Sequence, residues 1–454
     1  MQKKYLLFLL FLLLTMPLVK AQETWSLEQC IKYAFDNNIL IKQQQLNVKS
    51  REGDLFQSKI GLLPSLNASL SHNFNFGLAT NVETNQKEAQ NSQSTGVRLY
   101  SSMDLFKGLQ NYNAIKQSQF DLLATTSDVE KVKNNIALSI ASAYLQILYS
   151  EELVSSSNKQ LELSKLQVEK TTIQVKAGSL AEGSLLEIEA QKASDELTLV
   201  NAQNQLDIAY LTLTQLLDIK TTEGFKVQKP NLDSYEIKLL DLSPNGVYET
   251  SVQTMPQITS ANYRVSSAER GLKIAKGGMS PQLSLTASYS SGAQFYFTDV
   301  YYYKSGVKTL FVEDPFMTQI RNNASKSIGF DLTFPIFNGW KVRNNISKAK
   351  ISLDNAQLSL ANEKNVLFKD IQQAYTDALA AQKKYNATQK NLAALNEAFR
   401  YSEQKFNIGM VTSVEYTTAK TKLSKAETDL LQAKYELIFK TKILEFYKGI
   451  PLSL

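Results

Sequence analysis

Residues that could do chemistry are scarce in this 454-residue chain, which has one histidine, His72, and one cysteine, Cys30. A single thiol forms neither an internal disulfide nor a cysteine-based zinc site. A single imidazole leaves no partner for a histidine-rich metal site or a Ser-His-Asp arrangement. No glycine-rich dinucleotide or phosphate-binding motif occurs. Catalysis by a pair of carboxylates is the one formal possibility left. Because the other common catalytic and ligand-binding arrangements are missing, we expect no enzyme, no cofactor and no metal site.

The first 21 residues predict a secretory signal peptide. Lys3 and Lys4 precede an apolar run, and the small residue Ala21 supplies a cleavage point. The alternative, a retained N-terminal membrane helix, is disfavoured because the run is short. Removing the three lysines of this segment lowers the formal net charge from +6 to about +3. Such a small charge argues against a nucleic-acid partner.

The remainder of the chain consists of two copies of one internal repeat. An offset of 231 residues superimposes 106–219 on 337–450 without a gap, and an offset of 217 aligns Pro64 with Pro281. A repeat of this length predicts two equivalent structural units with the same elements in the same order. We place the first unit at 22–219 and the second at 243–454, with a linker over 220–242.

Each unit is expected to contain a very long helix, at about 109–177 and 340–408. Both stretches lack glycine and proline. At 1.5 Å per residue each helix would be about 100 Å long, which exceeds the core of a globular domain. Apolar residues recur at a coiled-coil spacing of seven in the first helix, at Ile140, Ile147, Val154, Leu161, Val168 and Val175.

The long helices end at Gly178 and Gly409. A glycine in the left-handed conformation is the usual device for reversing a helix, so each is expected to begin a hairpin. Shorter helices without proline in their interiors are predicted at 38–62, 184–217, 256–275 and 414–447. Laid end to end, the shorter helices of one unit could run alongside its long one.

Between the shorter and the long helices, the hydrophobic period changes from helical to two. This alternation predicts four strands, at about 64–76, 97–106, 281–297 and 327–337. Each has one apolar and one polar face. Asn-, Gln- and Ser-rich or Tyr-rich turns are expected to join each pair, at 77–93 and 298–326.

A soluble β-sandwich and a membrane β-barrel would show the same alternation, so the strands alone do not distinguish between them. The context favours a membrane barrel, because strands of about ten residues accompany rods too long for a soluble core. Four strands cannot close a barrel, so two or three chains must share them. The sequence therefore predicts an oligomeric channel-tunnel that is mainly α with a membrane β part. Aromatic residues suit an interfacial girdle at Phe74, Phe76, Tyr289, Phe295 and Tyr301–Tyr303.

The chain resembles the TolC-like outer membrane efflux proteins over nearly its whole length. The resemblance rests on the doubled unit, the strand exits L-F-K-G and I-F-N-G, and the hairpin K-F-N-I-G-M-V-T-S-V-E at Lys405–Glu415. It implies a homotrimer with a 12-stranded barrel in the outer membrane of a Gram-negative bacterium. It also implies a long antiparallel α-helical coiled-coil barrel through the periplasm. Its implied partners are outer membrane lipid, a periplasmic adaptor (membrane fusion) protein and an inner-membrane transporter of the RND, ABC or MFS type.

The resemblance further implies that the hairpin tips contact the adaptor, since they lie farthest from the barrel. Besides Gly178 and Gly409, the expected contact residues are Leu180, Val411 and Ser413. The first hairpin departs from the family pattern, because Gly183 is extra and Ser184 replaces the usual acidic residue, so the transfer is weaker there.

The resemblance places Glu415 at the position of an acidic ring that narrows the tunnel entrance. The next acidic position of that pattern is Thr418 in this chain. An ordinary solvated glutamate is the alternative interpretation of Glu415.

The expected function is the passive exit duct of a tripartite efflux system, which exports small molecules such as drugs or other toxic compounds. An exit duct for type I protein secretion or for metal efflux is the alternative within the family, and the duct sequence does not distinguish the cargo. A secreted coiled-coil adhesin or stalk is the alternative outside it. That protein would fractionate as soluble and show no conductance.

Overall fold

The computed structural model describes residues 24–80, 85, 87–230, 243–297, 299–304 and 307–454. The predicted signal peptide and most of the predicted linker lie outside the described residues. The chain divides into two compact units. Unit 1 is Met1–Asn47, Thr126–Ser260 and Ala361–Leu454, and unit 2 is Val48–Thr125 and Ala261–Leu360. Each unit therefore draws on both predicted repeats, whose boundaries stay predictions.

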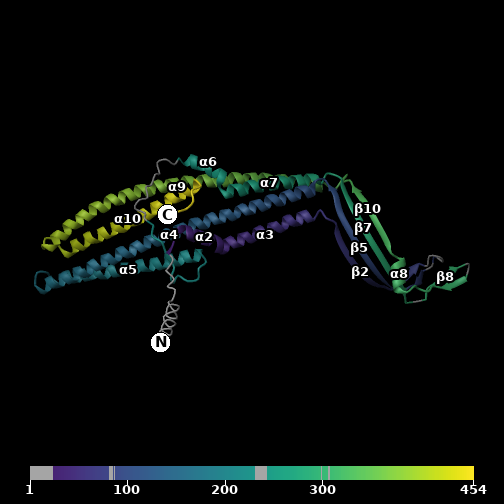
Figure 1. The fold of residues 1–454 in the computed structure, drawn as a ribbon, viewed down its shortest axis with the longest axis horizontal. Coiled ribbons are helices and arrows are strands. Elements are labelled where there is room, and N and C mark those ends of the chain that lie inside the picture. Colours follow the sequence, from purple (N-terminus) through teal and green to yellow (C-terminus); the bar gives the residue numbers. More distant parts are fainter. Residues whose placement is uncertain (1–23, 81–84, 86, 231–242, 298, 305–306) are drawn as a thin grey trace, which may run out of the picture. The chain divides into compact units, whose positions relative to one another are not determined.

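Two helical hairpins dominate unit 1 (Figure 1). Helix α4, Gln110–Lys176, is followed by α5, Glu182–Leu216. Helix α9, Lys341–Asn407, is followed by α10, Ser413–Tyr447. The predicted bounds of these four helices agree with the observed ones within two residues. Glycine follows the end of α4, α9 and α10, whereas α5 ends just before Asp218, which has a φ angle of +60°.

The core of unit 1 gathers the apolar side of α4 against α5, α10 and the N-terminal helix α2, Leu27–Asn37. Ile140 and Ile147, from the predicted heptad column, are fully buried in it. Helix α2 starts at a capping box, in which Ser26 Oγ accepts from Gln29 N and the Gln29 side chain accepts from Ser26 N. Helix α2 is not among the helices predicted from the sequence.

A second addition to unit 1 is helix α6, Pro244–Thr254, capped by Ser243. A third is a parallel pair of two-residue strands, β1, Thr24–Trp25, and β6, Lys226–Val227. A strand of two residues is too short for a hydrophobic period to reveal it. The hydroxyl of Tyr144 on α4 holds the pair, lying 2.6 Å from Gln228 O and 3.0 Å from Trp25 O.

Unit 2 contains the end of helix α3, Ile39–Ile60, most of α7, Pro256–Gly277, and a four-stranded antiparallel sheet. The helices match the predicted spans at 38–62 and 256–275. Within the described residues, no helix combines the length and the apolar composition needed to cross a bilayer.

The sheet has the strand order β10-β7-β5-β2. Its strands are β2, Ser65–Asn75; β5, Ser92–Lys107; β7, Gln282–Tyr296; and β10, Ser325–Thr333. Strand β5 starts five residues before its predicted start, since its polar first residues pair on both sides. Strand β10 ends four residues early, at Thr333, shortly before Pro335, which has no amide hydrogen for a ladder.

The register separates the two faces of the sheet as the alternation predicts. One face is mostly apolar, where Leu70 lies opposite Val97 and Leu283 lies opposite Leu332. The other face is mostly serine, threonine, asparagine and glutamine. The apolar face is uncovered within the chain on both edge strands, at Leu66, Leu70, Ile328 and Phe330.

The two connections between strands are more ordered than predicted. The first contains the short hairpin β3, Leu78–Thr80, with β4, Lys87–Ala89, and the second contains β8, Tyr301–Lys304, with β9, Val307–Leu310. The expectation that the chain has only four strands is therefore wrong.

The second connection also forms helix α8, Phe316–Asn322, beside the end of β7. Beyond Ser325, the first residue of β10, side chains of this connection form hydrogen bonds with the backbone edge of β7. The Gln319 side chain bonds both N and O of Gln294, and Asn323 Nδ2 donates to Gly292 O.

Strand β5 passes into α4 through a tight junction at Gly108. The φ angle of Gly108 is +56°, and a Cβ placed there would lie 2.3 Å from the carbonyl oxygen of Gly277 at the end of α7. A Cβ on Gly277 would lie 2.4 Å from Gly108 O. The two backbones therefore touch without a side chain between them.

Candidate functional site

The two hairpin tips in unit 1 are built by the same glycine motif. Gly178 and Gly409 have φ angles of +71° and +76°. Gly178 N donates to Val175 O and Ser179 N donates to Gln174 O, so the last carbonyls of α4 are satisfied. Gly409 N and Met410 N repeat this pattern at the end of α9. The predicted left-handed caps are confirmed.

The predicted contact residues differ in exposure. Gly178 and Gly409 are exposed, whereas Leu180 and Val411 are half-buried. Ser413 is buried, and its hydroxyl donates to the carboxylate of Glu187 on the other hairpin. The expectation that Ser413 is an accessible adaptor contact is therefore wrong, because its side chain faces the neighbouring hairpin of its own chain.

Glu415 and Thr418 are both exposed on the first turns of α10. The backbone N of Glu415 donates to Thr412 Oγ1 at 3.2 Å, so Thr412 caps the helix. The Glu415 carboxylate forms no ion pair with a residue that the structure describes. Its first-turn position is favourable for a negative charge even without a functional role.

An apolar cluster joins the two tips. Ile188 of α5 is 1% exposed and packs with Phe406 of α9 and Tyr416 of α10. The rings of Phe406 and Tyr416 are stacked with their centroids 4.7 Å apart. Burial raises the pKa of the Tyr416 hydroxyl to about 12, since the phenolate would lose its hydration.

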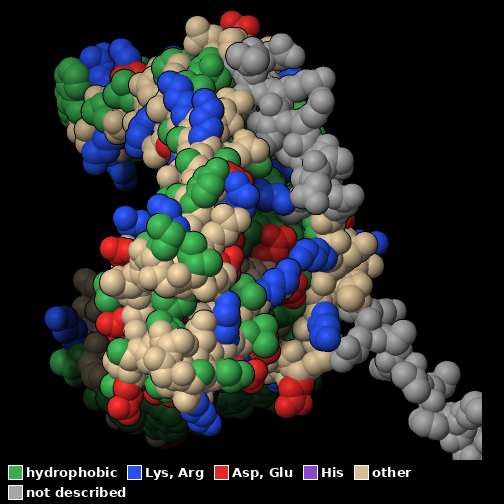
Figure 2. Space-filling model, turned by 90° about the vertical axis from the view of Figure 1, so that its left-hand side faces the viewer, with side chains coloured by type: hydrophobic (Ala, Val, Ile, Leu, Met, Phe, Trp, Pro, Cys, Tyr) green, Lys and Arg blue, Asp and Glu red, His purple; other side chains and the backbone are tan. Residues whose placement is uncertain are grey.

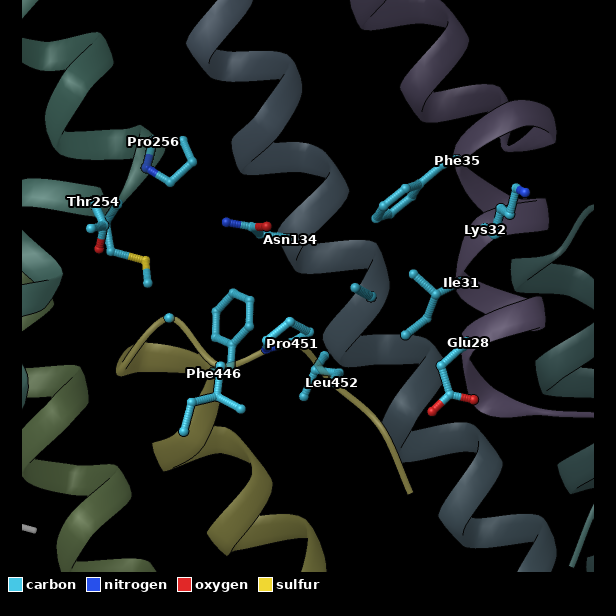
Figure 3. A pocket seen from close by; sticks show the side chains of 14 residues that line it. Glu28, Ile31, Lys32, Phe35, Asn134, Thr254, Pro256, Phe446, Pro451 and Leu452 are labelled. Carbon is cyan, nitrogen blue, oxygen red and sulfur yellow. The ribbon is translucent and has the colours of Figure 1, made fainter. Parts of the chain in front are cut away.

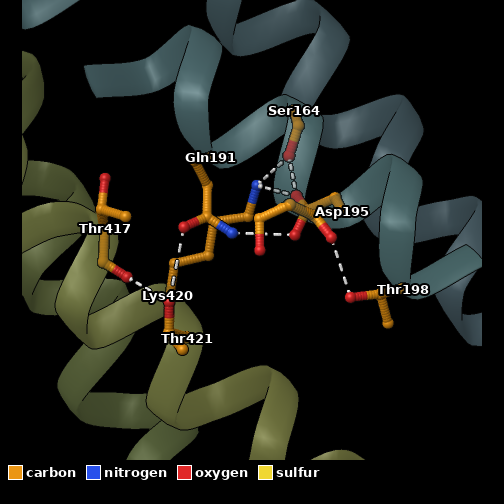
Figure 4. Close-up of polar contacts among 8 residues, drawn as sticks. Ser164, Gln191, Asp195, Thr198, Thr417, Lys420 and Thr421 are labelled. Atoms are coloured by element: carbon orange, nitrogen blue, oxygen red, sulfur yellow. Dashed lines mark hydrogen bonds and ion pairs between the residues drawn. The ribbon is translucent and has the colours of Figure 1, made fainter.

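Further along the helices, a buried polar network connects the same hairpins (Figure 4). Lys420 Nζ of α10 lies 3.6 Å from Asp195 Oδ2 of α5 and donates to Ser164 Oγ of α4 at 2.6 Å. Ser164 also donates to Asp195, and Gln191 Nε2 donates to Asp195 Oδ1 at 2.8 Å. Desolvation lowers the pKa of Lys420, although the Asp195 carboxylate opposes this shift.

Sequence reasoning missed this network, but a signal for it exists. The buried residues Ile188, Asp195, Ala202 and Ala209 of α5 are spaced by seven. Asp195 is therefore a charged residue within an apolar heptad column. Such a residue requires a buried partner, yet the sequence does not say that Lys420 supplies it.

Exposed hydrophobic side chains surround the tips. Figure 2 views the molecule from the hairpin end and shows hydrophobic side chains beside lysines and arginines. Five large apolar residues there are more than half exposed: Ile173, Leu186, Ile408, Met410 and Val414. Exposed apolar residues at a tip are suited to binding a partner protein.

The largest cavity among those described lies elsewhere in unit 1 (Figure 3). It measures 510 Å³ and is lined by α2, α4, residues 254–256 and the C-terminal segment. Phe35 and Phe446 point into it, while Glu28 stands at its border and accepts from Leu454 N. None of the predicted site residues lines this cavity.

Neither Cys30 nor His72, the lone thiol and the lone imidazole of the sequence, belongs to the tips. Cys30 is fully buried in the core of unit 1, and burial raises the pKa of its thiol to about 12, which keeps it protonated. His72 lies on β2, with Nδ1 2.8 Å from Thr95 Oγ1. Among the described residues, no three His, Cys, Asp or Glu side chains are grouped to hold a metal ion.

Comparisons with known proteins agree on one family. The model of the outer membrane efflux protein family matches residues 30–218 and 247–442. The outer membrane efflux protein BepC of Brucella suis is 20% identical over 414 residues, which cover 89% of this chain and 81% of BepC. The outer membrane protein TolC of Escherichia coli is 22% identical over 67% of this chain and 59% of TolC. The solved structure of CusC has a TM-score of 0.78 at 19% identity and covers 96% of both chains.

Proposed function

Since the chain belongs to the outer membrane efflux protein family and is an outer membrane efflux channel, we propose that three copies form the exit duct of a tripartite efflux system. The duct would export small molecules, such as drugs or other toxic compounds, from the periplasm of a Gram-negative bacterium. It would be passive, because an inner-membrane transporter of the RND, ABC or MFS type supplies the energy.

The observation that carries this proposal is the sheet of unit 2. Among the described residues, its edge strands β2 and β10 each pair with a strand on one side only, and both have an exposed apolar face. An open four-stranded sheet with uncovered leucine, isoleucine and phenylalanine is unstable in water, but it suits lipid when its edges are paired. Three copies that pair β10 with the neighbour's β2 would give 12 strands, with the polar face around a water-filled lumen.

Aromatic residues at the end of the sheet next to the connecting loops also support a barrel with its apolar face in lipid. Phe74 of β2 and Phe76, which follows this strand, stack with Phe297 at centroid distances of 6.2 and 6.4 Å. Phe295 stacks with Phe316 of α8 at 6.4 Å. We propose that these rings form the outer interfacial girdle of the barrel.

The hairpin tips are the proposed adaptor site. Their exposed apolar residues, among them Ile408 and Met410, would bind the adaptor, with Leu180 and Val411 contributing from half-buried positions. Glu415, exposed beside the tip, would form an acidic ring of three at the tunnel mouth, with Thr418 behind it.

The decisive experiment is to extract the protein from outer membranes in detergent, measure its mass and record from planar bilayers. We expect a trimer, a mainly helical circular dichroism spectrum and discrete conductance steps. A stable, well-folded monomer without conductance would contradict the shared barrel and favour a secreted stalk.

A further inference from the structure

Charged side chains are rare on the polar face of the four-stranded sheet. In the described strands they are Arg98, Asp104, Lys107 and Asp331. Lys107 Nζ lies 3.0 Å from Asp104 Oδ2, and Asp331 accepts from Thr286 Oγ1 at 3.2 Å. Three of the four therefore have partners close by.

Arg98 differs from these three. It is exposed and forms no ion pair with any residue that the structure describes. Its guanidinium carbon lies 5.8 Å from the ring centroid of Tyr100, which stands two residues along on the same face. A guanidinium held over a tyrosine ring keeps its full charge and its hydrogen-bond donors for a solute.

The row of the sheet that contains Arg98 is otherwise serine. Arg98 lies opposite Ser69 of β2 on one side and Ser290 of β7 on the other, and Ser290 lies opposite Ser325 of β10. Asp104 is six residues away along β5, or about 20 Å, which is beyond the screening length in physiological salt. No acidic group in this row neutralises the arginine.

We propose that Arg98 is a selectivity residue, which places a ring of three positive charges in the lumen and attracts anionic solutes. The proposal rests on the three-chain barrel proposed above. In that barrel, each Arg98 is separated from the next by serines, whose hydroxyls also donate hydrogen bonds. A carboxylate or phosphate group is the solute chemistry that such a ring recognises.

Three fixed charges that line a water-filled lumen act on the permeating ion, because the low-dielectric wall around the lumen concentrates their field. The same charge on the outer face of the sheet would act on lipid and not on the permeating ion. Lys326 provides this comparison, since it lies one residue along β10 from Ser325, opposite Tyr289 on the apolar face. It is also exposed.

The test is the reversal potential across a potassium chloride gradient in planar bilayers, for wild type and for the variants Arg98→Ser, Arg98→Lys and Lys326→Ser. Serine already fills the rest of the row, so Arg98→Ser should assemble normally. We expect its chloride-to-potassium permeability ratio to fall by about twofold or more, as the loss of a fixed charge ring predicts. Arg98→Lys and Lys326→Ser should behave like wild type.

Block by citrate added to the outer side is a second readout. Citrate should block wild type and Arg98→Lys more strongly than Arg98→Ser. Channels of Arg98→Ser with wild-type selectivity and citrate block would overturn the proposal, as would an equal shift in Lys326→Ser. Absence of any channel from trimeric wild type would instead overturn the proposed function, and the role of Arg98 with it.

Discussion

Lys420 Nζ lies 3.6 Å from Asp195 Oδ2, and both side chains are buried where the two hairpins of unit 1 meet. The pair belongs to different hairpins, so it can persist only while α5 and α10 stay together. Breaking one partner of a buried pair leaves an uncompensated charge, which is more costly than losing the attraction itself.

Asp195→Ala is therefore expected to raise the free energy of the packed tips by about 3–5 kcal/mol. Amide hydrogen exchange in α5 and α10 of the intact protein measures this as faster opening. The double variant Asp195→Ala, Lys420→Met removes both charges and should recover most of the protection. Glu196→Ala, which breaks the exposed Lys192–Glu196 pair on the same helix, is the control and should change little. Equal effects of Asp195→Ala and Glu196→Ala on the exchange rates would contradict the role of the buried pair.

The tip cluster should weaken at alkaline pH because of Tyr416. Its pKa is raised from 10.0 to about 12 in the folded state. The stabilisation is thus fully present below pH 10 and is lost as the pH rises through 12, since the unfolded state releases the proton first. A rise of the pKa from 10.0 to about 12 corresponds to about 2–3 kcal/mol of stabilisation.

Tyr416→Phe tests this pH dependence against wild type. The difference in hydrogen-exchange protection between the two proteins should change between pH 10 and pH 12 and stay constant below pH 10. Taking the difference cancels the contribution of Lys420, because both proteins contain it. Parallel pH profiles would show that Tyr416 does not titrate with tip opening.

Replacing either tip glycine with valine should distort its hairpin. Gly178 and Gly409 have positive φ angles, and a Cβ costs about 1–2 kcal/mol in that conformation, although neither would meet another atom within 4 Å. We expect normal trimers with weakened binding to the adaptor, measured by pull-down with the purified adaptor. Gly183→Ala is the matched control, because Gly183 lies in α5 without a positive φ angle and alanine favours a helix. Unchanged binding in both valine variants would show that the tips do not present the adaptor site.

Glu415→Ala should shift the channel towards anions, which is the opposite direction from Arg98→Ser. Three carboxylates that converge on one axis attract cations. Single-channel recording across a salt gradient, with and without divalent cations, measures selectivity and block. Glu182→Ala, which removes an exposed first-turn carboxylate from the other hairpin, is the control. Identical behaviour of wild type and Glu415→Ala would place Glu415 on the outer wall.

Long helices and sheet faces follow from the sequence because single local rules determine them. The bounds of α4 and α9 come from an uninterrupted run that ends at glycine, and the faces of β2 and β10 come from strict alternation. Helix α8 and the Lys420–Asp195 pair could not be predicted from the sequence. Helix α8 is held by side-chain bonds to the backbone of β7, and the buried pair joins residues more than 200 positions apart. Both depend on contacts between distant segments that no local pattern encodes.

The contact between Gly108 and Gly277 leaves no route for compensating substitutions. In most packed contacts, a larger residue on one side can be accommodated by a smaller one on the other. Here both positions already hold the smallest residue, and the obstacle each would meet is the other's carbonyl oxygen. A library randomised at both positions should therefore return glycine twice, and related sequences that keep this junction should change neither residue alone nor the two together.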